Sequence, residues 1–312
     1  YLAISPDGNT LYSVDNRSVD PESKNQSVNA FRVNQEDLSL KYLNNQSSEG
    51  RGPCHVYAST KHLFVANYGS GHATCISLLP DGRLEFSTSA VSAVGSGPNQ
   101  NRQKGPHAHQ VMLDPSGNFL LVPDLGTDKV MNYVLDGESG KLTPNPEQAW
   151  LDLPPGAGPR HMAFHPSGKF VYVLSEMNSM LTACSFDEKS GVLKILNAES
   201  IVKDGFSGNK QAAAVRVHPN GKFVYASNRD DVDNLAAFKI NENGGIERIQ
   251  LLEGIPHWPR DFNISPDGKH MLIAGARANE IQLFKIDGET GKLESTEAKI
   301  SVPVPTCVLF VD

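Results

Sequence analysis

Five polar residues between positions 109 and 260 could do chemistry if the fold brought them together. They are one histidine, one glutamate and three arginines: His109, Glu176, Arg160, Arg229 and Arg260. An imidazole and a carboxylate can move protons near neutral pH. Guanidinium groups repel one another unless an anion joins them, and they bind carboxylate or phosphate through paired hydrogen bonds. Together these groups suit the addition of water, or of a carboxylate, to an sp² carbon, with arginines holding the developing oxyanion charge. We therefore expect an anionic lactone, or its open acid, as the ligand.

A repeated turn phrase determines where these residues lie. The phrase is Ser, Asp or His followed by Pro-x-Gly and a short apolar strand, and it occurs at residues 5–8, 114–117, 165–168, 218–221 and 265–268. The prolines from Pro115 on are 51, 53 and 47 residues apart. Pro6 and Pro115 are 109 residues apart, which is two periods, and a degenerate copy at residues 59–62 stands between them. Self-similarity at this period indicates an array of like supersecondary units.

Each unit has the signals of four β-strands. In the unit that starts at residue 159, segments 161–164, 170–174 and 181–186 are rich in apolar residues, and segment 192–196 alternates weakly, as an edge strand does. Four strands in about fifty residues is a β-propeller blade, and no window has an apolar stripe of helical period and length. The sequence predicts a single all-β propeller domain over 1–312, with repeats near 1–53, 54–107, 108–158, 159–211, 212–258 and 259–304.

The two ends of the chain predict a seventh blade. Residues 1–6 match 161–166, but the residues that come before 161 in its repeat have no counterpart before residue 1. Residues 305–310 match 159–164, where a unit starts. A seven-bladed β-propeller of four-stranded blades accounts for both ends. It would place the first strand of the seventh blade at 305–312, and about forty to fifty N-terminal residues of that blade would be missing from this chain. Sharing one blade between the two ends also removes open sheet edges.

Equivalent positions in the repeats lie at equivalent places in a propeller, so polar exceptions at such positions indicate function. The position six residues before each turn proline is occupied by Cys54, His109, Arg160, Ala213, Arg260 and Thr306. The position ten residues after it is occupied by Asn16, Tyr68, Leu125, Glu176, Arg229 and Ala276, allowing for the short second unit. Innermost strands line the channel of a propeller, and their ends open on one face. We therefore expect the five polar residues around one cavity, with Tyr68 and Asn67 on its wall.

Composition and charge exclude several classes of partner. The chain has 312 residues, of which 39% are hydrophobic, and a formal net charge of −7. It has no basic tract for nucleic acid and no apolar run of membrane-spanning length, so neither partner is expected. Its four cysteines lack metal-type spacing and fall in predicted strands, where cysteine usually fills space as a small apolar residue: Cys54, Cys75, Cys184 and Cys307. A cytoplasmic protein is the default expectation, and export remains an alternative because the N-terminal residues are expected to be absent.

Structural interpretations compete with functional ones at several positions. A lone arginine in a propeller channel is more often structural than catalytic, but the set of five comes from four different units. His161 precedes apolar strand residues and can equally be a packed core histidine. His165 and His218 occupy the serine position of the turn phrase, so we expect them to cap turns. His107 and His109 point the same way on an extended strand, but no carboxylate is near them in sequence, and no metal is expected.

Several phrases of the chain resemble those of the seven-bladed propeller lactonases. They are the repeated turn phrase, Gly-Pro-His-Ala-His at 105–109, Gly-Pro-Arg-His at 158–161, Ser-Glu at 175–176 and Ser-Asn-Arg at 227–229. The family includes propeller-type 6-phosphogluconolactonases and the fungal 3-carboxy-cis,cis-muconate lactonizing enzyme, a cyclase. The resemblance spans residues 1–312. In the cyclase branch it implies an active site of His, Arg, Glu and Arg, matched here by His109, Arg160, Glu176 and Arg229, and it implies no metal or other cofactor.

The resemblance implies hydrolysis of 6-phospho-D-glucono-1,5-lactone to 6-phosphogluconate in the pentose phosphate pathway. His109 or Glu176 would then be the base toward water, and Arg160 and Arg229 would stabilise the tetrahedral oxyanion. The expected substrate contacts are Arg260, which would hold a phosphate or a carboxylate, and Tyr68, Asn67 and His161. The alternatives are a muconate-type lactonizing enzyme (a cycloisomerase) and a non-catalytic propeller that binds a sugar acid or a protein partner. The protein is expected to be a monomer or a homodimer.

Overall fold

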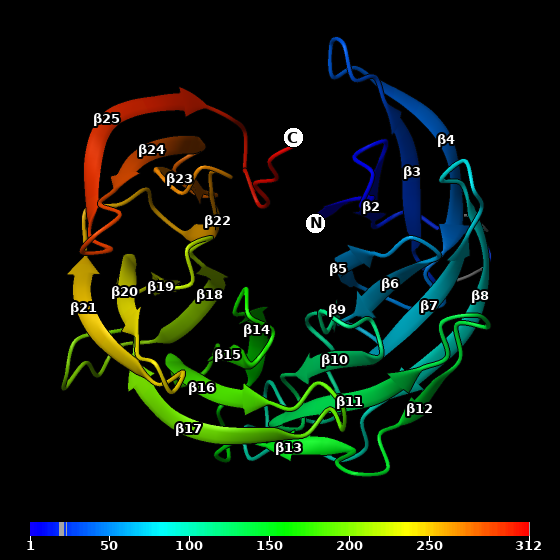
Figure 1. Ribbon diagram of the computed structural model, residues 1–312, viewed down its shortest axis with the longest axis horizontal. Coiled ribbons are helices and arrows are strands. Elements are labelled where there is room, and N and C mark those ends of the chain that lie inside the picture. The colour runs from blue at the N-terminus through cyan, green and yellow to red at the C-terminus, as the bar shows by residue number, and fades with distance from the viewer. Residues whose placement is uncertain (19–21, 23, 312) are drawn as a thin grey trace. The chain divides into compact units, whose positions relative to one another are not determined.

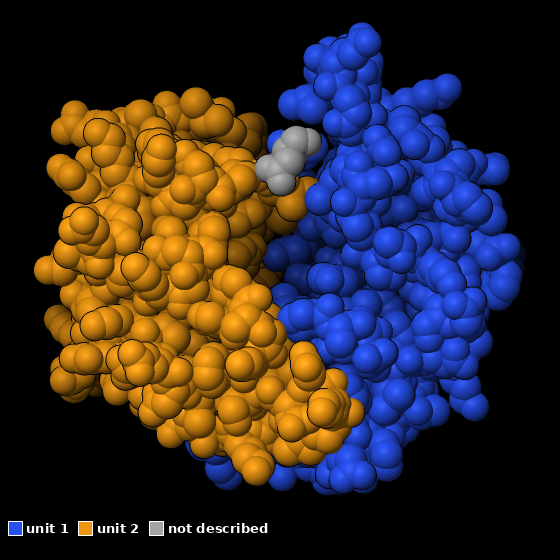
Figure 2. Space-filling model, viewed as in Figure 1, with its two compact units in different colours: residues 1–155, 311–312 blue, residues 156–310 orange. Residues whose placement is uncertain are grey.

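The protein is built from antiparallel sheets whose strands follow one another in chain order. The computed structural model describes residues 1–18, 22 and 24–311. These residues form 25 strands in six sheets, and within each sheet neighbouring strands pair in sequence order, apart from an extra strand in the third (Figure 1). This meander of four strands, with its turn phrase between the first and second, is the blade that the sequence predicts. The chain divides into two compact units of three sheets each, residues 1–155 with 311–312 and residues 156–310 (Figure 2).

The first unit holds sheets 1 to 3. Sheet 1 consists of β1 (Leu2–Ile4), β2 (Thr10–Asp15), β3 (Ser27–Val33) and β4 (Leu40–Ser47). Sheet 2 consists of β5 (Pro53–Ala58), β6 (His62–Asn67), β7 (His72–Leu78) and β8 (Leu84–Ser92). Sheet 3 consists of β9 (Met112–Leu113), β10 (Phe119–Asp124), β11 (Lys129–Leu135), β12 (Leu142–Pro144) and β13 (Trp150–Asp152). Both β12 and β13 pair with β11, so the outer strand of sheet 3 is interrupted, and Pro144 and Pro146 stand at the interruption, where they cannot donate to a ladder.

The second unit holds sheets 4 to 6. Sheet 4 consists of β14 (Pro159–Phe164), β15 (Phe170–Ser175), β16 (Met180–Phe186) and β17 (Leu193–Ser200). Sheet 5 consists of β18 (Lys210–Val217), β19 (Phe223–Asp230), β20 (Asn234–Ile240) and β21 (Ile246–Leu252). Sheet 6 consists of β22 (Pro259–Ile264), β23 (His270–Gly275), β24 (Glu280–Ile286) and β25 (Leu293–Ser301). The sheets lie near the predicted repeats, although β18 begins before residue 212. The single-domain organisation stays a prediction.

The described residues contain six blades, not seven. The prediction of a strand at 305–312 is wrong for residues 305–311, which are assigned to no strand, and residue 312 lies outside the described residues. The segment instead bonds to the side chains of β22. The N–H of Val308 donates to Asp261 Oδ2 at 2.9 Å, and Asn263 Nδ2 donates to the Val308 carbonyl at 3.0 Å. A strand requires a neighbouring backbone ladder, which these side-chain bonds do not provide.

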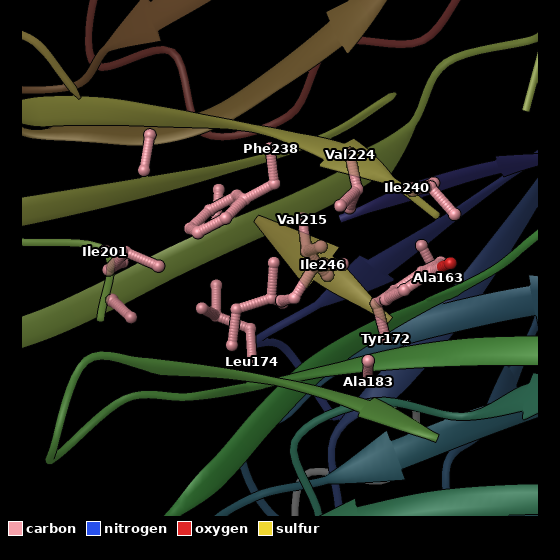
Figure 3. Packing of buried hydrophobic residues seen from close by; sticks show 14 of the residues in the cluster. Ala163, Tyr172, Leu174, Ala183, Ile201, Val215, Val224, Phe238, Ile240 and Ile246 are labelled. Atoms are coloured by element: carbon pink, nitrogen blue, oxygen red, sulfur yellow. The ribbon is translucent and has the colours of Figure 1, made fainter. Parts of the chain in front are cut away.

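Neighbouring sheets bury their apolar faces against each other. In the second unit β14 packs on β18, and β18 packs on β22. Figure 3 shows the contact between sheets 4 and 5, where Tyr172 and Leu174 of β15 meet Val215 and Phe238 of sheet 5. The central strands are buried on both faces, and their Val, Phe, Tyr and Ala residues form near-continuous apolar runs for that reason. The outer strand β25 is largely exposed, as the weak alternation of the outer strands indicates.

A tyrosine and an aromatic ring of one sheet contact a glycine turn of the next. The hydroxyl of Tyr172 donates to the carbonyl of Gly244 at 3.2 Å, and that of Tyr225 donates to Gly291 at 2.9 Å. A Cβ atom on Gly244 would lie 2.1 Å from the ring of Phe170, and the glycine has φ +85°. Only glycine meets both conditions without strain. These contacts join successive sheets at the turn end.

The histidines of the turn phrase also join successive sheets. His165 Nδ1 accepts the N–H of Ser167 at 3.0 Å, which caps the turn as predicted. Its other nitrogen, Nε2, therefore carries the proton and donates to the Gly221 carbonyl of sheet 5 at 2.8 Å. His218 does the same, with Nδ1 accepting from Asn220 at 3.1 Å and Nε2 lying 2.8 Å from the Gly268 carbonyl of sheet 6.

Among the described residues, no helix has the length and the apolar character needed to cross a membrane.

Candidate active site

β-bulges place the side chains at the start of the inner strands. The pairing of β14 with β15 skips Arg160, that of β22 with β23 skips Arg260, and that of β5 with β6 skips Cys54. The pairing of β18 with β19 likewise shifts, across Ala213 and Ala214. These are the positions six residues before the turn proline. A bulged residue is unpaired and its side chain is re-aimed, so this position can carry a functional group without loss of ladder bonds.

Arg160, Glu176 and Arg229 form a buried cluster in the second unit. Nε of Arg160 donates to Glu176 Oε2 at 2.8 Å, and Nη2 of Arg229 donates to the same oxygen at 3.2 Å. The three residues are only 2%, 3% and 4% exposed. Arg160 lies in the bulge of β14, Glu176 directly follows β15, and Arg229 lies near the end of β19. The sequence prediction that these three converge is therefore matched by their contacts.

Backbone hydrogen bonds hold each member of this cluster in place. The N–H of Glu176 donates to the Gly158 carbonyl at 2.8 Å, and its carbonyl accepts from the N–H of Ala212 at 3.1 Å. Arg160 also donates through Nη1 to the carbonyl of Ala213, the bulged residue of β18. Arg229 donates through Nε to the Gln211 carbonyl at 3.3 Å. Both guanidinium groups are thus oriented by sheet 5 as well as by Glu176.

The cluster carries one more positive than negative formal charge. Two guanidinium groups and one carboxylate are removed from water, and burying charge is costly unless it is paired and hydrogen-bonded. Glu176 offsets one cation. An anion, or an oxyanion that develops during a reaction, would offset the other through the planar donor fork of an arginine. The site therefore suits negative charge that appears next to it.

The other predicted residues of the second unit lie close by in the fold. Arg260 is half-buried in the bulge of β22, the same place that Arg160 has in β14. His161 is 3% exposed and pairs with Leu174 across β14 and β15. Its burial within sheet 4 agrees with the interpretation as a packed core histidine. Its role as a substrate contact stays a prediction.

In the first unit, His109 and Tyr68 lie together. Their ring centroids are 5.4 Å apart in an edge arrangement, and His109 is 6% exposed. The ring of His107 stacks on Tyr68 at 4.5 Å, and His107 Nδ1 lies 2.8 Å from the Tyr68 carbonyl. Arg102 donates to the Tyr68 hydroxyl at 3.3 Å. His109 therefore packs beside the ring of Tyr68, and the place of Tyr68 on the wall of a cavity stays a prediction.

Cys54 departs from the small apolar role expected of the cysteines. Its Sγ lies 3.3 Å from the carbonyl and 4.0 Å from Nδ1 of His109. All four cysteines are free thiols. Cys75 and Cys184 fit the expected role, because both are fully buried and burial raises the pKa of their thiols to about 11 and about 12. The thiol of Cys54 instead supports the position of His109.

Asn67 and Asp124 support the backbone around this group. Asn67 is fully buried, and its Nδ2 donates to the Ser48 carbonyl at 2.9 Å and to Thr74 Oγ1 at 3.2 Å. Asp124 accepts the N–H of His107 at 3.0 Å and the N–H of Thr127 at 3.0 Å. Asn67 thus anchors the end of β6 directly before Tyr68, and its predicted contact with substrate stays a prediction.

The structure brings the predicted residues together in two groups, one in each unit. Arg160, Glu176 and Arg229 form one group, and His109 and Tyr68 belong to the other. Their action in one cavity stays a prediction. Sequence reasoning missed Trp258, whose ring contacts Arg229 of the first group, and Arg277, which contacts Trp258 in turn. The sequence did contain a signal for Trp258. It stands before the proline that opens an inner strand in the sixth repeat, at the place where the fourth repeat has Gly158.

The chain is similar to lactonases along its whole length. The family described as "Lactonase, 7-bladed beta-propeller" matches residues 1–310. A 6-phosphogluconolactonase of Bacillus subtilis is 34% identical, with 100% of this chain and 86% of that protein covered. The crystal structure of a proposed 6-phosphogluconolactonase from Bacteroides fragilis has 33% identity and a TM-score of 0.93, and 100% of this chain and 86% of that chain are covered. The periplasmic gluconolactonase of Pseudomonas aeruginosa has 27% identity and a TM-score of 0.93 over 100% of this chain and 88% of that one. The fold is therefore an all-β propeller with four-stranded blades.

Proposed function

Because the chain belongs to the seven-bladed β-propeller lactonase family, we propose that it is a hydrolase that opens 6-phospho-D-glucono-1,5-lactone to 6-phosphogluconate, a step of the pentose phosphate pathway. One observation carries the proposal. Two buried arginines share a single glutamate oxygen, at 2.8 Å and 3.2 Å, in a chain that aligns with lactonases over its full length. The arrangement concentrates positive charge of the kind that the oxyanion of an opening lactone would need.

The proposed reaction is attack of water on the lactone carbonyl carbon. A base takes one proton from the water, the carbonyl oxygen becomes an oxyanion, and the tetrahedral intermediate collapses with cleavage of the bond between that carbon and the ring oxygen. The ring oxygen leaves as a hydroxyl after it accepts a proton, and the other product group is a carboxylate. We assign the base to His109, because Glu176 is engaged by two guanidinium groups; Glu176 is the alternative base.

Arg160 and Arg229 are proposed to stabilise the oxyanion. Their orientation by Glu176 and by backbone carbonyls of sheet 5 means that little reorganisation is needed when the charge develops. A preorganised donor of this kind typically contributes about 3 kcal/mol to the barrier. Arg260, Tyr68, Asn67 and His161 are the proposed contacts to the rest of the substrate.

Several finer expectations stay proposals. The family description supports a seventh blade in addition to the six described sheets. A cytoplasmic location is proposed, and a periplasmic one is the alternative, since one structural neighbour is a periplasmic gluconolactonase. The protein is proposed to act on a small anionic lactone as a monomer or homodimer, without nucleic acid or membrane partners.

The test measures hydrolysis of 6-phosphogluconolactone and of unphosphorylated glucono-1,5-lactone, corrected for spontaneous ring opening. It also measures the cyclisation of carboxymuconate and the reverse opening of its lactone. Arg160→Ala and Glu176→Ala should each lower kcat/KM for the phosphorylated lactone about 100-fold or more. Arg83→Ala and Glu138→Ala are matched controls, since both side chains form ion pairs at the surface. Rates unchanged by Arg160→Ala and Glu176→Ala would remove the catalytic assignment. Turnover of carboxymuconate alone would make the chain a cycloisomerase.

A further inference from the structure

Trp258 has a backbone conformation that glycine adopts at the same place in two other sheets. It precedes the proline that opens β22, and its φ is +61°. Gly52 and Gly158 stand at the same place before β5 and β14, with φ +61° and +62°. A bulky side chain in this left-handed region is strained, and such strain persists only where the surroundings enforce it. Val304, before Pro305, shares the region at φ +44°.

Neighbouring groups hold Trp258 in this conformation. Its N–H donates to Asp233 Oδ1 at 3.1 Å, and the Nδ1 of His257 lies 2.5 Å from Asp233 Oδ2. On the other side, the carbonyl of Trp258 accepts the N–H of Ala276 at 3.0 Å. The loop that carries the indole is thus fixed between sheets 5 and 6.

The indole of Trp258 contacts two guanidinium groups. Cζ of Arg277 lies 3.3 Å from the ring centroid, and Cζ of Arg229 lies 5.2 Å from the same centroid. Arg229 is buried in the cluster with Glu176, whereas Arg277 is exposed. In the part of the chain that the structure describes, the guanidinium of Arg277 has no ion pair or hydrogen bond. Stacking uses the flat face of a guanidinium and leaves its N–H edges available to a ligand.

The left-handed backbone of Trp258 carries a conformational cost. Glycine, which stands at the corresponding place in sheets 2 and 4, would remove that cost. What tryptophan provides here and glycine cannot is the ring face that contacts Arg277 and Arg229.

We propose that Arg277, stacked on Trp258, is the subsite for the phosphate group of the substrate, in place of Arg260, which then contacts another part of the substrate. The inference rests on the proposed function and identifies the part of that site which distinguishes a phosphorylated from an unphosphorylated sugar lactone. The guanidinium carbons of Arg277 and Arg229 lie no more than about 8.5 Å apart, which is 3.3 Å and 5.2 Å laid end to end. A sugar lactone spans this range, because only a few covalent bonds separate its carbonyl carbon from the phosphorus.

The chemistry of the two side chains fits a phosphate. A planar guanidinium binds phosphate through two parallel hydrogen bonds, which a lysine ammonium cannot do. The indole fixes the plane of the guanidinium before substrate arrives, so less conformational freedom is lost on binding. The same indole contacts Arg229. It therefore fixes the position of Arg277, at the phosphate end of the substrate, relative to Arg229, at the reacting end.

The first test compares Arg277→Gln with Lys285→Gln. Lys285 is an exposed cation of the same sheet and lies in β24 opposite His270, at the other end of β23 from Arg277, so the change in charge is matched. Arg277→Gln should raise KM for the phosphorylated lactone about 10-fold with kcat changed less than about 2-fold. The effect on unphosphorylated gluconolactone should be much smaller, and Lys285→Gln should change neither. Equal losses on both lactones, or no loss on either, would overturn the subsite.

The second test uses Trp258→Gly, which removes the indole and relieves the backbone. We expect the denaturation midpoint to hold or rise, while the ratio of kcat/KM values for phosphorylated over unphosphorylated lactone falls about 10-fold. A merely structural tryptophan would give the reverse result, with a lower midpoint and an unchanged ratio.

Direct binding separates this inference from the proposed function. Calorimetry with 6-phosphogluconate and with gluconate should show that Arg277→Gln weakens the phosphorylated acid about 10-fold more than the unphosphorylated one. If the wild type turned over neither lactone and this difference were still found, the proposed function would fall and the subsite would stand. If Arg277→Gln bound 6-phosphogluconate as the wild type does, the subsite would be wrong whatever the kinetics.

Discussion

Arg160 and Arg229 donate to the same oxygen of Glu176, although one lies in sheet 4 and the other in sheet 5. The distances are 2.8 Å and 3.2 Å. One carboxylate oxygen therefore sets the orientation of two cations, and each cation is held a second time by a backbone carbonyl of sheet 5. The cluster thus joins two blades at the point where the proposed chemistry occurs.

Replacing the acid of this cluster should affect rate and stability together. In Glu176→Gln two buried guanidinium groups lose their counter-charge. We expect kcat to fall about 100-fold and the free energy of unfolding to fall by about 3 kcal/mol. Glu280→Gln is the matched control, since Glu280 pairs with Lys299 at 2.9 Å on the surface and should change the free energy by about 0.5 kcal/mol or less. A folded Glu176→Gln protein with the kcat of the wild type would exclude Glu176 from the reaction.

A double-mutant cycle tests whether His109 acts in the same step as Glu176. His109→Asn should lower kcat about 100-fold, while His270→Asn, a change on β23, should leave it unaltered. If the two residues serve one step, the double variant loses little more than the worse single variant, because residues that act as a unit are not additive. Losses that multiply to about 10,000-fold would instead mean independent roles.

Asp124 should make the fold relatively more stable in acid. Burial raises the pKa of its carboxyl above the ordinary 3.8, although hydrogen bonds from His107 and Thr127 oppose this. The ionised form is therefore penalised in the folded state, and the penalty disappears as pH falls through the folded pKa toward 3.8. We expect the free energy of unfolding of the wild type, measured relative to that of Asp124→Asn, to be higher at about pH 4 than at about pH 7.

Asp136 is the control with the opposite sign. A hydrogen bond from the N–H of Glu138 lowers the pKa of its exposed carboxyl, so its contribution is present above the ordinary pKa and is lost as pH falls through the folded one. The wild type should therefore lose free energy of unfolding relative to Asp136→Asn as pH falls below about 4, from the ordinary pKa of 3.8 toward the lower folded one. The same sign for both aspartates would contradict the assignment.

The tyrosine bonds between sheets should contribute measurably to stability. Tyr225→Phe removes the donor to the Gly291 carbonyl, at 2.9 Å in the native protein, and leaves that buried acceptor without this bond. A loss of about 1–2 kcal/mol is expected from urea denaturation. Tyr42→Phe is the control, because Tyr42 is 53% exposed, and should stay within about 0.5 kcal/mol. Equal effects of the two substitutions would mean that the inter-sheet bond adds nothing.

The arrangement of strands was largely predictable from the turn phrase. Proline and glycine determine the dihedrals of that turn wherever it occurs, so Pro166 and Gly168 locate both flanking strands. Even the degenerate copy in sheet 2 forms a turn, in which the N–H of Ser59 donates to the His62 carbonyl at 2.8 Å. The interrupted outer strand of sheet 3 and the absence of a strand at 305–311 were not predictable, since both depend on which partner backbone is within reach.

The site was predictable where counting from the proline suffices, and not elsewhere. Arg160, Glu176 and Arg229 were found because equal repeat lengths carry equal positions to equal places. The contact of Trp258 with Arg277 was missed, since Arg277 follows β23 at no distinctive place in the repeat. The left-handed backbone of Trp258 depends on how β22 enters its sheet, and only the comparison with Gly158, at the same place in the fourth repeat, pointed to it.

The unpaired residue in the inner strands of four sheets has a consequence for how such proteins diversify. Because the ladder already omits it, its chemical type can change from thiol to guanidinium to methyl, as Cys54, Arg160 and Ala213 illustrate, without loss of a backbone bond. Side-chain chemistry at this position can thus change through single substitutions on an unaltered scaffold.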